Sequence, residues 1–150
     1  ALTGQARSRS ELADRLAKKG VPSEVAVALL DRFTEVGLID DAAFARQWVE
    51  SRQRGKGLAP RALAQELHRK GVAPEVANAA IETIDEQTQH DAALGLVRKR
   101  MRSVQGLDHQ KALRRLVSML ARKGYPPSMA YAIVNDELRA AGREPEDWGE

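Results

Sequence analysis

Three histidines and one pair of adjacent carboxylates are the residues of this sequence that could carry acid–base or metal chemistry. His68, His90 and His109 stand far apart, and none has a carboxylate or a second histidine at the spacing of a metal-binding helix. Asp40 and Asp41 could bind Mg²⁺ or exchange protons. They open a helical pattern, however, where aspartate caps free N–H groups and favours the positive end of the dipole. We expect capping there, with no catalytic residue and no metal site.

The Gly-Lys-Gly stretch at 55–57 superficially suggests a phosphate-binding loop. It lacks the preceding strand and the glycine spacing of such loops, so we expect a turn between helices. The chain contains no cysteine, which excludes disulfides, thiol catalysis and cysteine-based zinc sites. The sequence therefore predicts a protein that is not an enzyme and that holds no cofactor.

Basic side chains form two clusters that could bind an anionic partner, "RQRGK" at 52–56 and "RKRMR" at 98–102. With their neighbours they give the predicted partner-binding residues Arg46, Arg52, Arg54, Lys56, Arg61, Arg98, Lys99 and Arg102. A solvated helix face that steadies the C-terminal dipole is the alternative interpretation. A binding surface of this kind would suit either DNA phosphates or the carboxylates of a protein groove.

The elements that position these clusters repeat along the chain. "RLAKKGVPSEVAVALL" begins at residue 15, "ELHRKGVAPEVANAAI" at 66 and "MLARKGYPPSMAYAIV" at 119. The glycines of the three copies, Gly20, Gly71 and Gly124, recur at intervals of about 50 residues. Leucines four and eight residues before each glycine lie on one face of a helix. Each copy is therefore predicted to be a helical hairpin.

Each glycine is predicted to end the first helix of its hairpin in a left-handed conformation. The residue after it, Val21, Val72 or Tyr125, should then contact the leucine four positions before the glycine, as in a Schellman ending. Basic pairs precede the glycines, where they favour the negative end of the helix dipole and could extend the binding surface. These pairs are Lys18/Lys19, Arg69/Lys70 and Arg122/Lys123.

A third helix precedes the second and third hairpins, because "DAAF" at 41–44 matches "DAAL" at 91–94. We expect helices over 8–19, 23–36, 40–54, 59–70, 74–87, 89–104, 108–123 and 127–141. Phe44 and Trp48 have helical spacing, and we expect Trp48 to fill the core or a junction between repeats.

The predicted fold class is all-α, an elongated tandem array of three-helix repeats. Repeat 1 would span 1–36 with most of its leading helix missing, repeat 2 would span 37–87 and repeat 3 would span 88–142. Residues 143–150 would form a flexible acidic tail. Aromatic residues make up only 4% of the sequence, which favours closely packed helices over sheets.

The sequence also indicates where the protein acts. No apolar run is long enough to span a membrane, and no signal-peptide pattern opens the chain, so we expect a cytoplasmic protein without a membrane partner. We expect it to be a monomer. Because residue 1 is alanine and not methionine, we also expect the chain to begin inside a longer one.

The stretches "RSRSELADRLAKKGV", "GLIDDAAFARQWVESRQR", "GLAPRALAQELHRKGV" and "LVSMLARKGYPPSMAYAIV" together resemble the bacterial RecX regulatory proteins, in the same order and over nearly the whole chain. The resemblance implies an all-helical array of three-helix repeats that regulates the RecA recombinase. RecX-like proteins lodge in the groove of the RecA–DNA filament, limit its growth and lower the ATPase, strand-exchange and repressor-cleavage activities of RecA.

The leading hypothesis is therefore a non-enzymatic modulator of the RecA filament. One rival is a helical repeat protein that binds single- or double-stranded DNA directly through a basic stripe. Another is a helical scaffold for a different partner.

Overall fold

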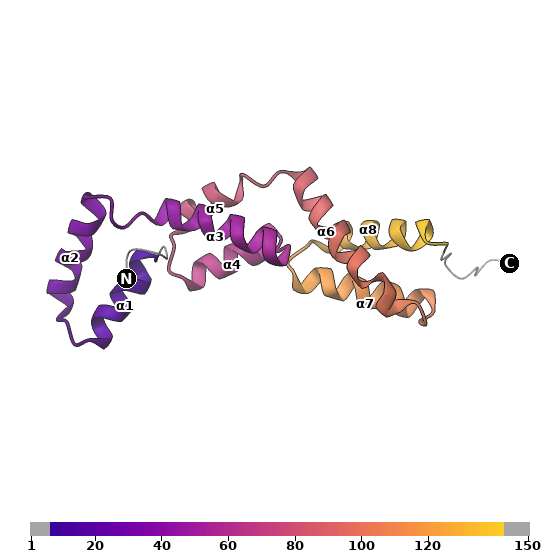
Figure 1. The fold of residues 1–150 in the computed structure, drawn as a ribbon, viewed down its shortest axis with the longest axis horizontal. Helices are drawn as coiled ribbons and strands as arrows, with labels where there is room; N and C mark the ends of the chain where they lie inside the picture. The colour runs from indigo at the N-terminus through magenta and orange to yellow at the C-terminus, as the bar shows by residue number, and fades with distance from the viewer. Residues whose placement is uncertain (1–6, 143–150) are drawn as a thin grey trace. The chain divides into compact units, whose positions relative to one another are not determined.

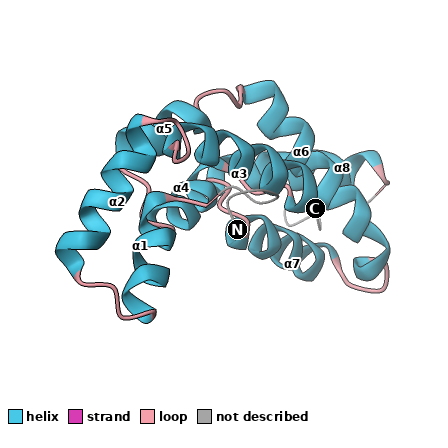
Figure 2. Ribbon diagram, turned by 60° about the vertical axis from the view of Figure 1, so that its left-hand side comes forward, coloured by secondary structure: helices cyan, strands magenta, loops and turns pink. Residues whose placement is uncertain are grey.

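The computed structural model describes residues 7–142, and all regular structure in this range is helical (Figure 1, Figure 2). The helices are α1 (Arg9–Lys18), α2 (Ser23–Glu35), α3 (Asp41–Lys56), α4 (Pro60–Arg69), α5 (Pro74–Ile81), α6 (Glu86–Arg100), the 3₁₀-helix η1 (Met101–Val104), α7 (His109–Arg122) and α8 (Pro127–Ala140). The predicted all-α class is confirmed. The expected stub of a leading helix before residue 7 and the expected acidic tail at 143–150 lie outside the described residues.

The chain divides into two compact units. The first consists of the residues up to Arg52 together with Leu63–Thr83, and the second consists of Gln53–Ala62 together with the residues from Ile84 onward. Helices α1, α2 and α5 therefore belong to the first unit, and α6, η1, α7 and α8 belong to the second. The division falls inside α3 and α4, so the last turn of α3 is part of the second unit.

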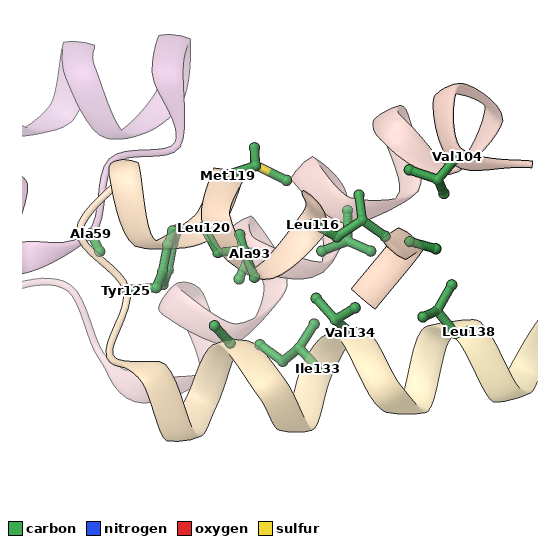
Figure 3. Packing of buried hydrophobic residues seen from close by; sticks show 13 residues of the cluster. Ala59, Ala93, Val104, Leu116, Met119, Leu120, Tyr125, Ile133, Val134 and Leu138 are labelled. Atoms are coloured by element: carbon green, nitrogen blue, oxygen red, sulfur yellow. The ribbon is translucent and has the colours of Figure 1, made fainter. Parts of the chain in front are cut away.

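The core of the second unit lies between α6, α7 and α8 (Figure 3). Helix α7 places apolar residues three and four positions apart on one face, including Leu116 and Leu120, which are almost fully buried. Ile133 and Val134 of α8 face them (Figure 3). Truncating one such leucine to alanine costs a protein roughly 2–5 kcal/mol, so this cluster is a main source of the unit's stability.

Two hydrogen bonds fix the segment before α4 to the rest of the second unit. The Ala59 N–H group donates to the Lys123 carbonyl at 2.9 Å. The Tyr125 hydroxyl donates to the Gly57 carbonyl at 2.7 Å. Burial raises the pKa of Tyr125 to about 12, so the side chain is a neutral donor at physiological pH. These two bonds hold the end of α3 and the start of α4 beside the loop between α7 and α8.

The three repeated glycines end helices as the sequence predicts. Gly20, Gly71 and Gly124 have φ angles of +82°, +78° and +97°. In each copy the residue after the glycine donates its N–H group to the carbonyl of the leucine four positions before it, which is a Schellman ending. These bonds join Val21 to Leu16, Val72 to Leu67 and Tyr125 to Leu120, at 3.0, 3.0 and 3.1 Å.

Gly71 also lies where the end of α4 meets the start of α1. A Cβ atom at Gly71 would overlap Cβ and Oγ of Ser10. Beside this contact, the buried Ser8 hydroxyl donates to the Lys70 carbonyl at 2.8 Å and accepts from the Glu11 N–H group at 3.1 Å. Ser8 therefore caps α1 and satisfies a carbonyl at the end of α4 at the same time, which requires the two helix ends to be in direct contact.

Asp40 and Asp41 serve two different helix starts. Asp40 accepts from the Ala43 N–H group at 3.0 Å, which is the predicted cap of α3. Asp41 instead accepts from the Arg9 N–H group at 2.9 Å, a free donor in the first turn of α1. Capping is therefore the observed role of Asp40, and Asp41 joins α3 to α1.

Several predicted helix bounds are wrong. Helix α5 ends at Ile81 rather than 87, because Asp85 opens the next helix at Glu86 by accepting from the Thr88 N–H group at 2.7 Å. That bond lowers the pKa of Asp85. Helix α6 ends at Arg100 rather than 104, where the Ser103 hydroxyl donates to the Arg100 carbonyl at 2.6 Å.

The expected turn at 55–57 is also wrong in part. Helix α3 continues through residue 55 and ends at Lys56, two residues beyond the predicted end. It is Gly57, with a φ angle of +65°, that adopts the left-handed conformation and stops the helix. A glycine at 55 lowers helix propensity but does not prevent helix formation. The sequence alone therefore could not show which of the two glycines ends the helix.

Replacing Gly71 by alanine should destabilise the protein more than replacing Gly20. Both glycines are left-handed, so each substitution should cost about 1–2 kcal/mol of unfolding free energy through backbone strain. At Gly71 the new Cβ also overlaps Ser10, whereas at Gly20 it meets no atom within 4 Å. Overpacking should add roughly 1–3 kcal/mol at Gly71. Urea denaturation followed by circular dichroism measures the difference, and equal losses for the two variants would contradict the contact.

Candidate partner-binding surfaces

Arg52, a predicted partner-binding residue, is engaged inside the first unit. It donates from Nε and Nη2 to the Glu66 carboxylate, with an Nη2–Oε2 distance of 2.5 Å. Trp48 donates from Nε1 to the same carboxylate at 2.9 Å. The hydrogen bond from Arg52 lowers the pKa of Glu66, against the opposing effect of burial. The same bond raises the pKa of Arg52. Arg52 therefore stabilises the packing of α3 on α4 and does not need a partner to balance its charge.

Trp48 organises a second cation of the predicted surface, Lys70. The Lys70 ammonium lies 4.9 Å from the centroid of the Trp48 ring and 3.2 Å from Oε2 of Glu11. Trp48 also stacks on Phe44, with ring centroids 5.8 Å apart. Trp48 is thus a packing residue of the first unit. Lys70, expected as an extension of the binding surface, has its charge matched by Glu11.

Two lysines of the predicted clusters come together in the second unit, and a third predicted cation, Arg54, lines the same hollow. Lys56 ends α3 and Lys99 lies in the last turn of α6, and both side chains line one hollow of about 390 Å³. Both residues are exposed. The remaining lining residues are Gln53, Arg54, Gly55, Gly57, Thr88, Asp91, Ala92, Gly95 and Leu96. The clusters "RQRGK" and "RKRMR", 46 residues apart at their starts, therefore contribute to a single concave surface.

Glycines shape this hollow, and polar groups line it. Gly55, Gly57 and Gly95 leave its wall without side chains at three positions, which exposes backbone there. A Cβ at Gly57 would come within 3.0 Å of a Leu96 methyl carbon. Asp91, the only carboxylate among the lining residues, accepts a 2.8 Å hydrogen bond from the Gln87 amide, which leaves its negative charge in place. The lining thus combines three cations with one carboxylate.

The other predicted cations have different surroundings. Arg98 donates to Glu137 of α8 at 2.7 Å and so ties α6 to α8. Arg102 lies in η1, beyond the end of the helix α6 that carries Arg98. Arg98 is itself exposed, as are Lys56 and Lys99, and the other exposed residues of the predicted set are Lys18, Lys19, Arg46, Arg54, Arg61, Arg69, Arg102 and Arg122. Lys123 is partly buried, and its carbonyl accepts from Ala59.

A second hollow, along α7, involves basic residues that the sequence reasoning missed. Lys111, Arg114 and Arg115 line it together with Arg122, the only one of the four in the predicted set. The signal was present in "KALRRLVSMLAR", where cations recur three and four residues apart opposite the apolar face. It was overlooked because the cations are spread along the helix and not clustered at its end.

The residues that the structure describes offer no grouping for a metal ion. Within 7–142, no three or more His, Asp and Glu side chains come together in a way that could hold one. His109 is buried at the start of α7. In the same range no helix is long and apolar enough to cross a membrane.

Family models for three consecutive three-helix domains of RecX match the chain. The first matches residues 1–33, the second 40–81 and the third 87–134. The curated "Regulatory protein RecX" of Streptomyces lividans is 48% identical over 149 residues, which cover 99% of this chain and 79% of the relative. The protein of the same name from Thermobifida fusca (strain YX) is 45% identical over 143 residues, covering 95% and 77%.

Two solved structures share the fold. The crystal structure of RecX from Lactobacillus salivarius aligns with a TM-score of 0.83 at 19% identity, covering 93% of this chain and 90% of that one. A crystal structure of regulatory protein RecX aligns with a TM-score of 0.82 at 24% identity, covering 90% and 66%. At these identities the solved structures establish only the architecture of three-helix domains. The close sequence similarity is to the curated relatives.

Replacing Glu66 by glutamine should destabilise the protein in a pH-dependent way. The variant keeps an acceptor for Trp48 but loses the charge that Arg52 binds, at a cost of about 1 kcal/mol near neutral pH. Because the folded-state pKa of Glu66 is lowered, its stabilisation is complete above the ordinary glutamate pKa and is lost as the pH falls through the lowered value.

Thermal unfolding of both proteins between pH 7 and pH 3 tests this expectation. The difference in midpoint should be constant down to about pH 5 and should shrink below about pH 4. Glu35→Gln, at an exposed carboxylate, is the matched control. A difference that stays constant down to pH 3 would show that the charge on Glu66 contributes nothing.

Proposed function

The chain belongs to the RecX family, and we propose on that basis that it is a regulator that binds the RecA–DNA filament and restrains RecA. The observation that carries the proposal is the run of three family domains in order along the chain, with relatives close to half identical that are named regulatory proteins. Binding would lower the ATPase, strand-exchange and repressor-cleavage activities of RecA. The regulator acts in the cytoplasm as a monomer, and it works by occupying a surface rather than by catalysis.

The hollow lined by Lys56 and Lys99 is the proposed contact for an acidic side chain of RecA. Lys56 and Lys99 are exposed, and they line the same hollow from different helices. A carboxylate entering there would meet both cations, and the glycines of the wall would let it approach the backbone closely. Arg52 and Lys70 are not part of this contact, because Glu66 and Glu11 already balance their charges.

Inhibition of the single-strand-dependent ATPase of RecA tests the function. The protein should lower the rate at concentrations below that of RecA. Absence of inhibition at a several-fold excess over RecA would contradict the proposed function, whichever surface is involved.

Charge reversal tests the surface separately. Lys56→Glu/Lys99→Glu should raise the concentration needed for half-inhibition about tenfold, equivalent to about 1.4 kcal/mol of binding free energy. The matched control is Arg32→Glu/Arg139→Glu, which makes the same change in net charge at exposed positions of α2 and α8. Inhibition by the Lys56/Lys99 variant at the wild-type concentration would place the contact elsewhere while leaving the function standing.

A further inference from the structure

The outer face of α7 carries four basic side chains around a shallow hollow of about 380 Å³. The lining residues are Leu107, Lys111, Arg114, Arg115, Ser118 and Arg122. Because a helix has 3.6 residues per turn, positions 111, 115, 118 and 122 lie on one side of it. The opposite side is the buried face that carries Leu116 and Leu120. The cations therefore form an outward row roughly 16 Å long.

No acidic residue of α7 compensates these charges. The sequence of the helix contains neither aspartate nor glutamate. No ion pair joins any of the four cations to another residue within 7–142. Lys111 lies in the first turn, near the positive end of the helix dipole, and it repels Arg115 one turn away. Both arrangements disfavour the helix, so folding does not account for Lys111 and Arg115, whereas Arg122 in the last turn also favours the negative end of the dipole.

The repeat itself does not require this charge either. The equivalent positions lie 13, 10, 9, 6 and 2 residues before the repeated glycine, and in the other two copies they carry fewer cations. They are Leu58, Arg61, Ala62, Gln65 and Arg69 in the second copy, and Arg7, Ser10, Glu11, Asp14 and Lys18 in the first. The same hairpin forms with these different sets. The basic row is thus a property of α7 alone among the three copies.

We propose that the α7 face binds the phosphate backbone of duplex DNA. A row of roughly 16 Å spans about five 3.4 Å steps of one strand, and lysine, arginine and serine are side chains that contact phosphates without reading sequence. The face carries no aromatic side chain on which an unpaired base could stack, which favours a duplex over a single strand. The site is independent of the proposed RecA contact, because it needs no RecA.

Fluorescence anisotropy with a labelled 20-base-pair duplex tests the proposal. Four phosphate contacts predict that log K falls with log salt concentration at a slope of about −3.6. Arg114→Gln/Arg115→Gln should make that slope shallower by about 2 and should weaken binding at 50 mM NaCl at least roughly tenfold. Glutamine is a good helix former, and circular dichroism should show unchanged helicity. Lys111→Gln/Arg122→Gln, at the two ends of the row, should have the same effect.

Arg32→Gln/Arg139→Gln is the matched control and should leave affinity and slope unchanged. Three results would overturn the proposal. The first is an α7 variant that binds the duplex like the control, and the second is wild-type binding that is confined to a single strand of the same length. The third is competition by polyglutamate as strong as that by unlabelled duplex, which would assign the face to an acidic protein. Each readout uses the protein without RecA, so none of them bears on the ATPase test.

Discussion

The close approach of one helix end to the start of another helix is the constraint on which the first unit depends. An α-helix leaves its last carbonyls and its first N–H groups without partners, and burying them unpaired is costly. At the end of α4, left-handed Gly71 turns the chain so that Val72 bonds back to Leu67, and the Lys70 carbonyl is left for the Ser8 hydroxyl. Ser8 in turn caps α1. A side chain at position 71 would separate these partners.

This junction determines which cations remain available to a partner. Lys70 and Arg69 stand side by side in the sequence before Gly71. Lys70 turns towards Glu11 and the Trp48 ring, whereas Arg69 is exposed. Arg52 is likewise matched by Glu66, which also accepts from Trp48. The packing of α1, α3 and α4 therefore gives three similar-looking cations different roles. Lys70 and Arg52 are paired inside the unit, whereas Arg69 stays on the surface.

The helices and their glycine endings could be predicted because their causes are local. A leucine spacing, a basic last turn and a glycine act within a few residues of one another, and all three Schellman endings have the predicted bonds. The end of α5 was missed because Asp85 was not recognised as a cap, although its position before "EQTQ" was a usable signal. The partners of Arg52 and Lys70 were not predictable, since Glu66 and Glu11 lie 14 and 59 residues away. Tertiary pairing decides such contacts.

The central claim is that the regulator meets the RecA filament through the end of α3 and the facing turn of α6. Hydrogen–deuterium exchange of the protein, free and with saturating RecA filament on single-stranded DNA, tests it most directly. Backbone amides of the lining residues 53–57, 95, 96 and 99 should exchange more slowly when the filament is present. An exchange profile identical to that of the free protein would contradict the claim.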